Sequence, residues 1–228
     1  MTAPPAPRWA VYFAPQLDHP LWRAGCAWLG RDAAVASDRG PAPAQRDEPW
    51  RYGFHATLKA PFRLSSGQDA AELDRALSAL SRRHPAFLIP SLEVSTLADF
   101  VALRPAEALP RDHPLWQLAD ACVVELDPFR APASSAEQAR RAASATDAAA
   151  VERLERWGYP HVLGGWRFHL TLSNSLPPGT QREACLQQAR AHFAPVLATL
   201  PLRCADLCLF KQSAPDDAFV IERRYPLA

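Results

Sequence analysis

The sequence has few cysteines and no long apolar run. Its five cysteines form no Cys-x-x-Cys pair and have no histidine at zinc-finger spacing, so they do not indicate a zinc finger. An odd cysteine count without an apolar leader segment indicates a reducing compartment, and we expect a cytoplasmic protein. No run of about 18 apolar residues is present, so no membrane-spanning helix is expected.

The sequence also lacks an excess of charge of either sign. It has 25 basic and 24 acidic side chains, and the formal net charge is +1. A protein that coats long duplex nucleic acid usually carries a strong positive excess, so such a partner is not favoured. The hydrophobic fraction of 48% is typical of a soluble globular protein, and 228 residues suffice for one bilobal domain with a core.

One pattern is present twice. Residues 52–59 and 166–173 both alternate between apolar and small or polar side chains, as expected of strands with one buried face. His-x-Thr lies on the polar face each time, as His55 with Thr57 and His169 with Thr171. A single His-x-Thr pair on a strand is common and means little, whereas two in matching contexts indicate a shared function. The apolar faces comprise Tyr52, Phe54, Ala56 and Leu58 in the first copy and Trp166, Phe168, Leu170 and Leu172 in the second.

Each copy is followed by the same order of predicted elements, one helix and then two strands. The approximate repeats are 51–104 and 165–224, with little sequence identity outside the motifs. Capping-box spacing marks the start of each helix. The first predicted helix covers 69–83 and has Asp69 and Glu72 at this spacing. The second begins at Thr180 and has Glu183. The predicted strands cover 87–97, 100–103, 202–210 and 218–224.

Other segments lie outside the repeat. Residues 9–13 predict a first strand, residues 31–49 a loop, and residues 113–124 a helix. An Ala/Arg/Ser-rich segment at about 127–157 predicts an inserted pair of exposed helices. Its expected helix signals are Ser134 and Thr146 at the starts and Gly158 at the end.

The chemistry of the paired motif suits a phosphodiester. Histidine can take and give a proton near pH 7, and threonine offers a hydroxyl donor to a phosphate oxygen. If the two units face each other across a cleft, one imidazole can activate water while the other protonates the leaving oxygen. The pattern does not say which histidine does which. No acidic residues flank either histidine, so neither a metal nor another cofactor is expected.

The segments Phe54-His55-Ala56-Thr57-Leu58 and Phe168-His169-Leu170-Thr171-Leu172 resemble the paired motifs of the 2H phosphoesterase superfamily. The longer segments 28–32, 51–62, 157–162 and 210–212 resemble a branch associated with carbon–phosphorus lyase (phosphonate) operons. The resemblance implies an α+β fold, bilobal with pseudo-twofold symmetry, in which two antiparallel sheets line a central cleft and helices lie outside. It also implies metal-independent phosphodiesterase activity, with both histidines catalytic and both threonines binding substrate.

Four further residues are weaker candidates for substrate binding. Lys59 and Arg167 share the parity of the motif histidines and could neutralise a phosphate, although such residues are as often plain surface. Tyr12, on the first strand, could border the cleft. Gln212 could reach the ligand from the end of a late strand. His161, by contrast, is expected to be structural.

The sequence thus predicts a cytoplasmic hydrolase that cleaves a small cyclic phosphodiester, such as a ribose or nucleotide cyclic phosphate, in the setting of phosphonate metabolism. Two alternatives stay open. One is an enzyme that processes 2′,3′-cyclic ends of RNA, which the near-neutral charge disfavours. The other is a phosphometabolite-binding protein without turnover. The sequence leaves the substrate, the direction of ring opening and the oligomeric state open.

Overall fold

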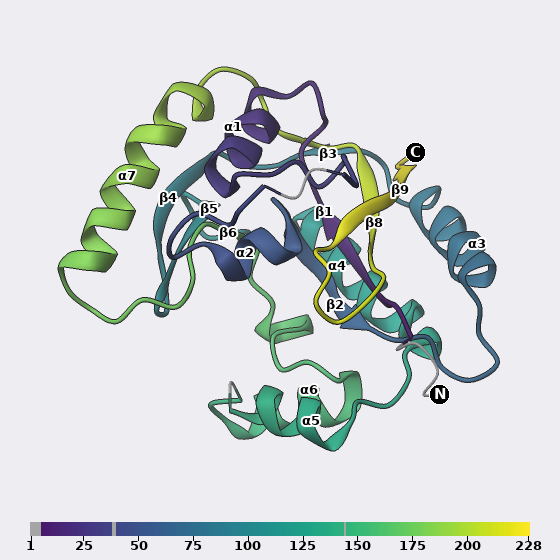
Figure 1. The fold of residues 1–228 in the computed structure, drawn as a ribbon. Helices are drawn as coiled ribbons and strands as arrows, with labels where there is room; N and C mark the ends of the chain where they lie inside the picture. Colours follow the sequence, from purple (N-terminus) through teal and green to yellow (C-terminus); the bar gives the residue numbers. More distant parts are fainter. Residues whose placement is uncertain (1–5, 38–39, 144) are drawn as a thin grey trace.

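The computed structural model describes residues 6–37, 40–143 and 145–228 (Figure 1). The first part of the Pro/Ala-rich start, residues 1–5, lies outside the described residues. Helices and strands are mixed, and every strand pair among the described residues is antiparallel. This confirms the α+β class predicted from the sequence. No helix in the described part of the chain is both long and apolar enough to cross a membrane.

The larger sheet has four strands, drawn from both ends of the chain. Their order is β2 (Ala56–Phe62), β1 (Arg8–Phe13), β8 (Asp206–Gln212) and β9 (Val220–Pro226). β2 carries the first motif and follows a short helix, α2 (Asp47–Tyr52). The strand predicted at residues 9–13 is therefore central, and it separates the first motif strand from the C-terminal hairpin.

The second sheet has three strands in the order β4 (Leu92–Leu97), β5 (Phe100–Pro105) and β6 (Leu170–Thr171). β6 belongs to the second motif. A small pair, β3 (Phe87–Leu88) with β7 (Arg203–Cys204), lies apart from both sheets.

The two sequence repeats therefore exchange strands. The motif strand of the first repeat, β2, lies in the sheet that contains the hairpin of the second repeat, β8–β9. The motif strand of the second repeat, β6, pairs with the hairpin of the first repeat, β4–β5. Each sheet thus contains residues from both repeats.

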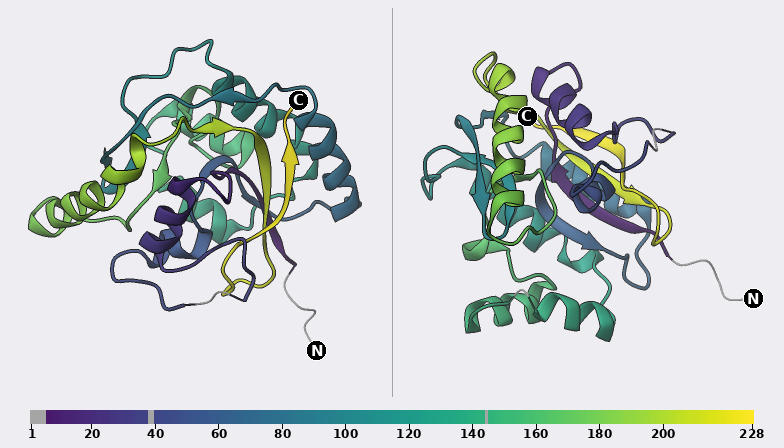
Figure 2. Two further views of the ribbon diagram at one scale, coloured as in Figure 1. Left: turned by 90° about the horizontal axis from the view of Figure 1, so that it is seen from above. Right: turned by 60° about the vertical axis from the view of Figure 1, so that its left-hand side comes forward.

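Helices cover the outer faces of the sheets (Figure 2). α3 (Ala70–Ser81) packs on β8 and β9, and α4 (Pro114–Glu125) packs on β2. α7 (Thr180–Leu197) packs on β4 and β5, with α1 (Pro20–Leu29) beside it. In α3 the predicted capping box of Asp69 and Glu72 is formed.

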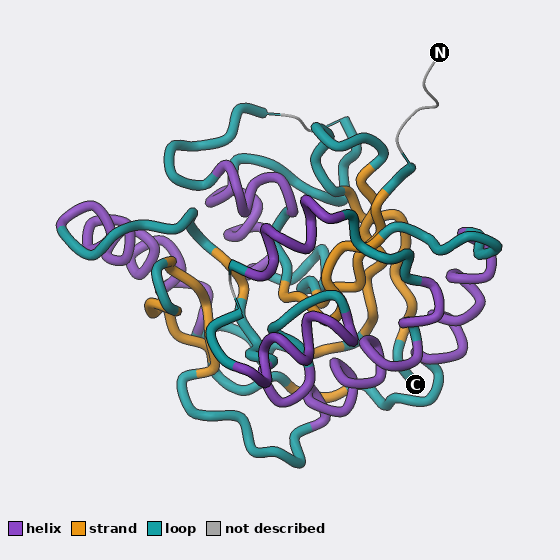
Figure 3. Tube along the Cα trace, turned by 90° about the horizontal axis from the view of Figure 1, so that it is seen from below, coloured by secondary structure: helices purple, strands orange, loops and turns teal. Residues whose placement is uncertain are grey.

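The predicted insertion is a helix pair, α5 (Ser135–Ala142) and α6 (Ala148–Trp157), which lies at the bottom of the molecule in Figure 1. Figure 3 shows the molecule from this side. It follows the short 3-10 helix η1 (Asp127–Phe129), and a second one, η2 (Leu163–Gly165), leads to the second motif. Ser134 caps α5 as predicted. Asp147, not Thr146, caps α6, because its carboxylate accepts the Ala150 N–H at 2.7 Å.

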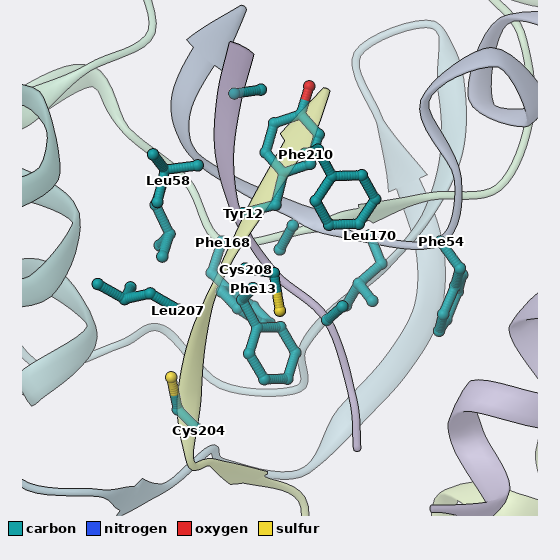
Figure 4. Close-up of a cluster of buried hydrophobic side chains, with 14 of the residues drawn as sticks. Tyr12, Phe13, Phe54, Leu58, Phe168, Leu170, Cys204, Leu207, Cys208 and Phe210 are labelled. Atoms are coloured by element: carbon teal, nitrogen blue, oxygen red, sulfur yellow. The ribbon is translucent and has the colours of Figure 1, made fainter. Parts of the chain in front are cut away.

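The apolar faces predicted for the two motifs are buried in one core between the sheets and helices (Figure 4). Tyr52 is the exception, since it is only half-buried. Four of the five cysteines are buried and all five are free, so the buried ones serve as small core residues. The labelled side chains of this core cluster are Tyr12, Phe13, Phe54, Leu58, Phe168, Leu170, Cys204, Leu207, Cys208 and Phe210.

Three further sequence-based expectations for the elements were wrong. The first motif strand begins at Ala56 rather than Tyr52, because residues 47–52 are helical and Gly53 turns the chain. β6 has only two residues. The helix α7 has Gly179 at its N-cap without a side-chain cap, so the expected box of Thr180 and Glu183 is not formed.

Candidate active site

His55 is held in one orientation by the turn that precedes it. Gly53 has φ of 80°, a left-handed conformation that glycine adopts freely, and a Cβ there would lie 2.7 Å from the Ala33 Cβ. The Gly53 carbonyl accepts a hydrogen bond from Nδ1 of His55 at 2.8 Å. Because Nδ1 donates, Nε2 of the neutral ring carries the lone pair, and the Thr57 hydroxyl can donate to it at 3.3 Å. The first motif therefore presents Nε2 as its basic atom.

His169 is held in the same way. Its Nδ1 donates to the Arg167 carbonyl at 2.8 Å, and this carbonyl again lies two residues before the histidine. Thr171 follows on β6 and pairs with Ala102 of β5. The Thr171 hydroxyl has no hydrogen-bond partner among the described residues, so it is available to a ligand. Both motifs therefore fix the imidazole by Nδ1 and leave Nε2 for chemistry.

The two motifs lie side by side in the structure. The indole N–H of Trp166, in the second motif segment, donates to the Thr57 carbonyl of the first motif at 2.8 Å. The imidazoles also lie close enough to interact electrostatically: burial is the main cause of the lowered pKa of His55, and a positive charge on His169 lowers it further. We call the four residues that this arrangement brings together, His55, Thr57, His169 and Thr171, the histidine site.

Aromatic side chains surround His55. The Tyr12 ring stacks on its imidazole with centroids 3.7 Å apart and an angle of 24° between the planes. Tyr52 and Phe210 lie at 6.2 and 6.1 Å. Burial among these rings lowers the pKa of His55 to about 4, against an unperturbed value of about 6.5. His55 is therefore neutral at pH 7.

The surroundings of His169 differ from those of His55, because His169 has one aromatic neighbour and several basic side chains near it. Phe100 is 5.6 Å away, measured between ring centroids. Burial lowers the pKa of His169, and the charges of His161, Arg104 and Arg167 lower it further. A negatively charged ligand would offset these charges and favour the protonated imidazole.

The expectation that Lys59 shares a face with Thr57 was wrong. Thr57 pairs with Tyr12, and Lys59 pairs with Val11, so two residues of β2 are spanned against one residue of β1. This β-bulge reverses the alternation of side chains. Lys59 is accordingly only 3% exposed, and its ammonium donates to the Val123 carbonyl of α4 at 3.0 Å.

Gln212 also lies away from the histidine site, at the far end of β8, and is 1% exposed. Its Oε1 accepts a hydrogen bond from Arg8, and its Nε2 donates to the carbonyls of Pro215 and Asp217. The side chain therefore holds the turn between β8 and β9. Of the four weaker candidates, the structure brings only Tyr12 and Arg167 to the histidines.

Two further features of the described residues bear on the site. No group of three or more His, Cys, Asp or Glu side chains there is arranged to hold a metal ion. A groove of about 310 Å³ lies elsewhere, between the start of β4 and the end of α7, and apolar side chains such as Leu88 and Leu200 line it. None of the motif residues borders this groove, so the groove is not part of the histidine site.

Sequence reasoning missed several residues at the histidines. Tyr52 was assigned to the core because residues 52–59 were interpreted as a strand. Residue 52 instead ends helix α2, which places its ring beside His55. Phe100 and Arg104 come from β5, which pairs with the motif strand β6, and Phe210 comes from β8, which pairs with β1. No sequence signal indicates either pairing. His161 was expected to be structural, and the pKa of His169 shows that it lies close enough to act on the site.

Comparison with known protein families identifies the family of this chain. The family described as "Protein of unknown function (DUF1045)" matches residues 57–220, which begin at Thr57 of the first motif and include the whole second motif. The chain belongs to the DUF1045 family. Two curated relatives of this DUF1045 protein carry the name ribose 1,5-bisphosphate phosphokinase PhnN. The protein from Janthinobacterium sp. (strain Marseille) is 34% identical over 97% of this chain, and that from Laribacter hongkongensis (strain HLHK9) is 39% identical over 82%.

The DUF1045 chain spans about half the length of these relatives, namely 51% and 44% of them. Solved structures similar to it include E. coli LigT complexed with 3′-AMP, at 16% identity and a TM-score of 0.44 over 98% of this chain and 99% of that one. Another, described simply as a phosphoesterase, has 14% identity and a TM-score of 0.45 over the same shares. Kluyveromyces marxianus Usb1 has 12% identity and a TM-score of 0.37 over 96% and 98%.

Proposed function

We propose that this chain is a metal-independent 2H phosphodiesterase that hydrolyses a small cyclic phosphodiester by general acid–base catalysis with two histidines. The observation that carries the proposal is the matched pair of Nδ1 hydrogen bonds, from His55 to the Gly53 carbonyl and from His169 to the Arg167 carbonyl. A binding protein does not need two imidazoles fixed in the same way. A catalyst that moves two protons does.

The reaction is a hydrolysis. Nε2 of one neutral histidine takes a proton from water as its oxygen attacks phosphorus, and the opposite P–O bond of the ring breaks. Nε2 of the other histidine, protonated at the start, gives its proton to the leaving oxygen. With substrate bound, the Thr57 hydroxyl turns from Nε2 of His55 to one non-bridging oxygen, and Thr171 donates to the other as charge builds. The products are a phosphate monoester and a free hydroxyl, and proton exchange with solvent restores both histidines.

The surroundings of the two histidines favour one assignment of roles. The aromatic rings around His55 hold its pKa at about 4, so it is neutral and suited to act as the base. His169 lies among cationic groups that lower its pKa. A bound phosphodiester would offset those charges, so His169 is suited to gain its proton when substrate binds and to act as the acid.

The relatives support a ribose phosphate as the substrate class. They are named for a ribose 1,5-bisphosphate kinase and carry the PhnN name, which fits the phosphonate setting of the sequence resemblance. Hydrolysis of a cyclic ribose phosphate yields a ribose phosphate monoester, the class of compound on which such a kinase acts. We therefore propose that the activity serves ribose phosphate metabolism.

The proposal is tested by a panel of cyclic phosphates assayed with excess EDTA. We expect ribose 1,2-cyclic phosphate and nucleoside 2′,3′-cyclic phosphates to be hydrolysed, and an RNA oligonucleotide with a 2′,3′-cyclic end to react more slowly. EDTA should leave the rates unchanged. Strict dependence on an added divalent ion, or binding of inorganic phosphate without hydrolysis of any compound, would contradict the proposal. Preference for the oligonucleotide would favour RNA end processing instead.

The pH profile follows from the two lowered pKa values. As the pH falls through about 4, His55 becomes protonated and can no longer act as base, so kcat/KM falls. Because the pKa of His169 is also lowered, His169 loses its proton in the free enzyme at a lower pH than an ordinary histidine does, and kcat/KM falls again as the pH rises. A plot of kcat/KM against pH is expected to be bell-shaped, with its maximum on the acid side of neutrality. Its two apparent pKa values belong to the coupled pair of histidines. In kcat, the alkaline limb should lie at higher pH because bound substrate is negative.

Variants of Tyr12 provide the control for this profile. Tyr12→Ser removes the ring that stacks on His55 and should move the acid limb to higher pH, because a more hydrated imidazole is easier to protonate. Tyr12→Phe keeps the ring and should leave that limb in place. A rate that rises steadily through pH 9 in the wild type would rule out the paired histidines as acid and base.

A further inference from the structure

A third strand contributes side chains to the histidine site. In the register of β5 with β6, Ala102 pairs with Thr171, so these two side chains lie on the same face of the sheet. Side chains alternate along a strand, so Phe100 and Arg104 share that face. The contact between Phe100 and His169, with ring centroids 5.6 Å apart, independently shows that this face borders the site.

The guanidinium of Arg104 lies along this face. Its Nη1 donates to the Thr96 carbonyl at 3.0 Å. Thr96 lies on β4 and pairs with Val101, so the side chain reaches back from Arg104 toward β4. Glu93 is directly opposite Arg104 in the register, but it is exposed and no ion pair joins the two within the described residues.

A second arginine brings positive charge to the same place. Arg167 is exposed, and its carbonyl holds the His169 ring. Together with His161 and Arg104, it lies close enough to His169 for its charge to act on the imidazole. Neither arginine has a carboxylate partner in the part of the chain that the structure describes. The His169 side of the site therefore has more positive charge than the single negative charge of a diester requires.

We propose that Arg104, with Arg167 and His161, forms a subsite for a second anionic group. The substrate would then be a cyclic phosphodiester that also carries a phosphate monoester. The planar guanidinium fork of Arg104 suits the oxygens of such a group. This inference rests on the proposed function, because the subsite is defined by its position beside the reacting diester.

The test compares substrates that differ only in the second phosphate. α-D-Ribose 1,2-cyclic phosphate and adenosine 2′,3′-cyclic phosphate would each be assayed with and without a 5-phosphate or 5′-phosphate. We expect the wild type to prefer the phosphorylated member in at least one pair. Arg104→Ala should lower kcat/KM for that member by about 10- to 100-fold, mainly through KM, because a charge-assisted hydrogen bond is lost. The unphosphorylated member should be unaffected.

The control is Arg182→Ala. Arg182 lies on α7, behind the same sheet, and also donates to a backbone carbonyl, that of Ala98 at 3.4 Å. It should leave both members of each pair unchanged, and Arg104→Lys should retain part of the preference. Thermal unfolding of each variant separates binding from folding effects. Equal wild-type rates within each pair, or equal losses for both members in Arg104→Ala, would overturn the subsite. Failure to hydrolyse any of the four compounds would instead contradict the proposed function, and the subsite with it.

Discussion

His55→Ala and His169→Ala are each expected to lower kcat on a cyclic phosphodiester by about 10²–10⁴, the usual contribution of one general acid or base. The double variant should lose less than the product of the two factors, because the histidines act in one concerted proton transfer. The measurement is steady-state turnover of the four proteins on one substrate that the wild type cleaves. Binding of inorganic phosphate should survive better than turnover, because Thr57 and Thr171 remain.

A histidine outside the site provides the matched control. His113 is the N-cap of α4, where its Nδ1 accepts the Leu115 N–H at 3.2 Å. His113→Asn keeps a good N-cap and should leave kcat unchanged. If either His55→Ala or His169→Ala retained near wild-type turnover, the two-histidine mechanism would be wrong, and the motifs would serve to bind phosphate only.

Trp166→Ala is expected to destabilise the protein by about 3–5 kcal/mol, the usual cost of removing a large buried aromatic side chain. Trp166 is 4% exposed and packs edge-on against Trp116, with ring centroids 5.2 Å apart. It also joins the two motifs through its hydrogen bond to the Thr57 carbonyl. Trp166→Phe should cost less, about 0.5–1.5 kcal/mol for the lost hydrogen bond, and should reduce kcat while the protein stays folded. Urea unfolding and turnover measure the two effects.

Trp157→Phe is the matched control for that variant. Trp157 lies at the end of α6 and is half-buried, and its indole forms no hydrogen bond within the described residues. Its replacement should have little effect on kcat. Equal kcat for Trp166→Phe and the wild type would mean that the bond between the motifs does not position them.

Local patterns predicted much of the fold because they depend on neighbouring residues. The capping box at Asp69 and Glu72 correctly indicated the start of α3, and alternation correctly indicated the buried apolar side chains of both motifs except Tyr52. These signals arise within a few residues. The grouping of the two motifs at one site was also predicted, because equal motifs in equal contexts favour one shared role.

Features set by contacts between distant strands could not be predicted. The bulge that turns Lys59 inward is defined by the pairing of β2 with β1, and nothing near Lys59 in the sequence indicates it. Arg104 reaches the site only because β5 pairs with β6. Tyr52 was misplaced because an alternating pattern of apolar residues also fits the end of a short helix.

The exchange of strands between the repeats has a consequence for synthesis on the ribosome. When the first repeat has emerged, β1 can pair with β2, but the other edge of β1 stays unpaired until β8 emerges. The β4–β5 hairpin likewise stays without its third strand until β6 emerges. Pairing between such distant segments closes long loops and is slow. Until then, the open edges can pair with wrong strands. The nascent chain is therefore exposed to mispairing until its last strands emerge, and a fragment that ends within the second repeat cannot complete the larger sheet.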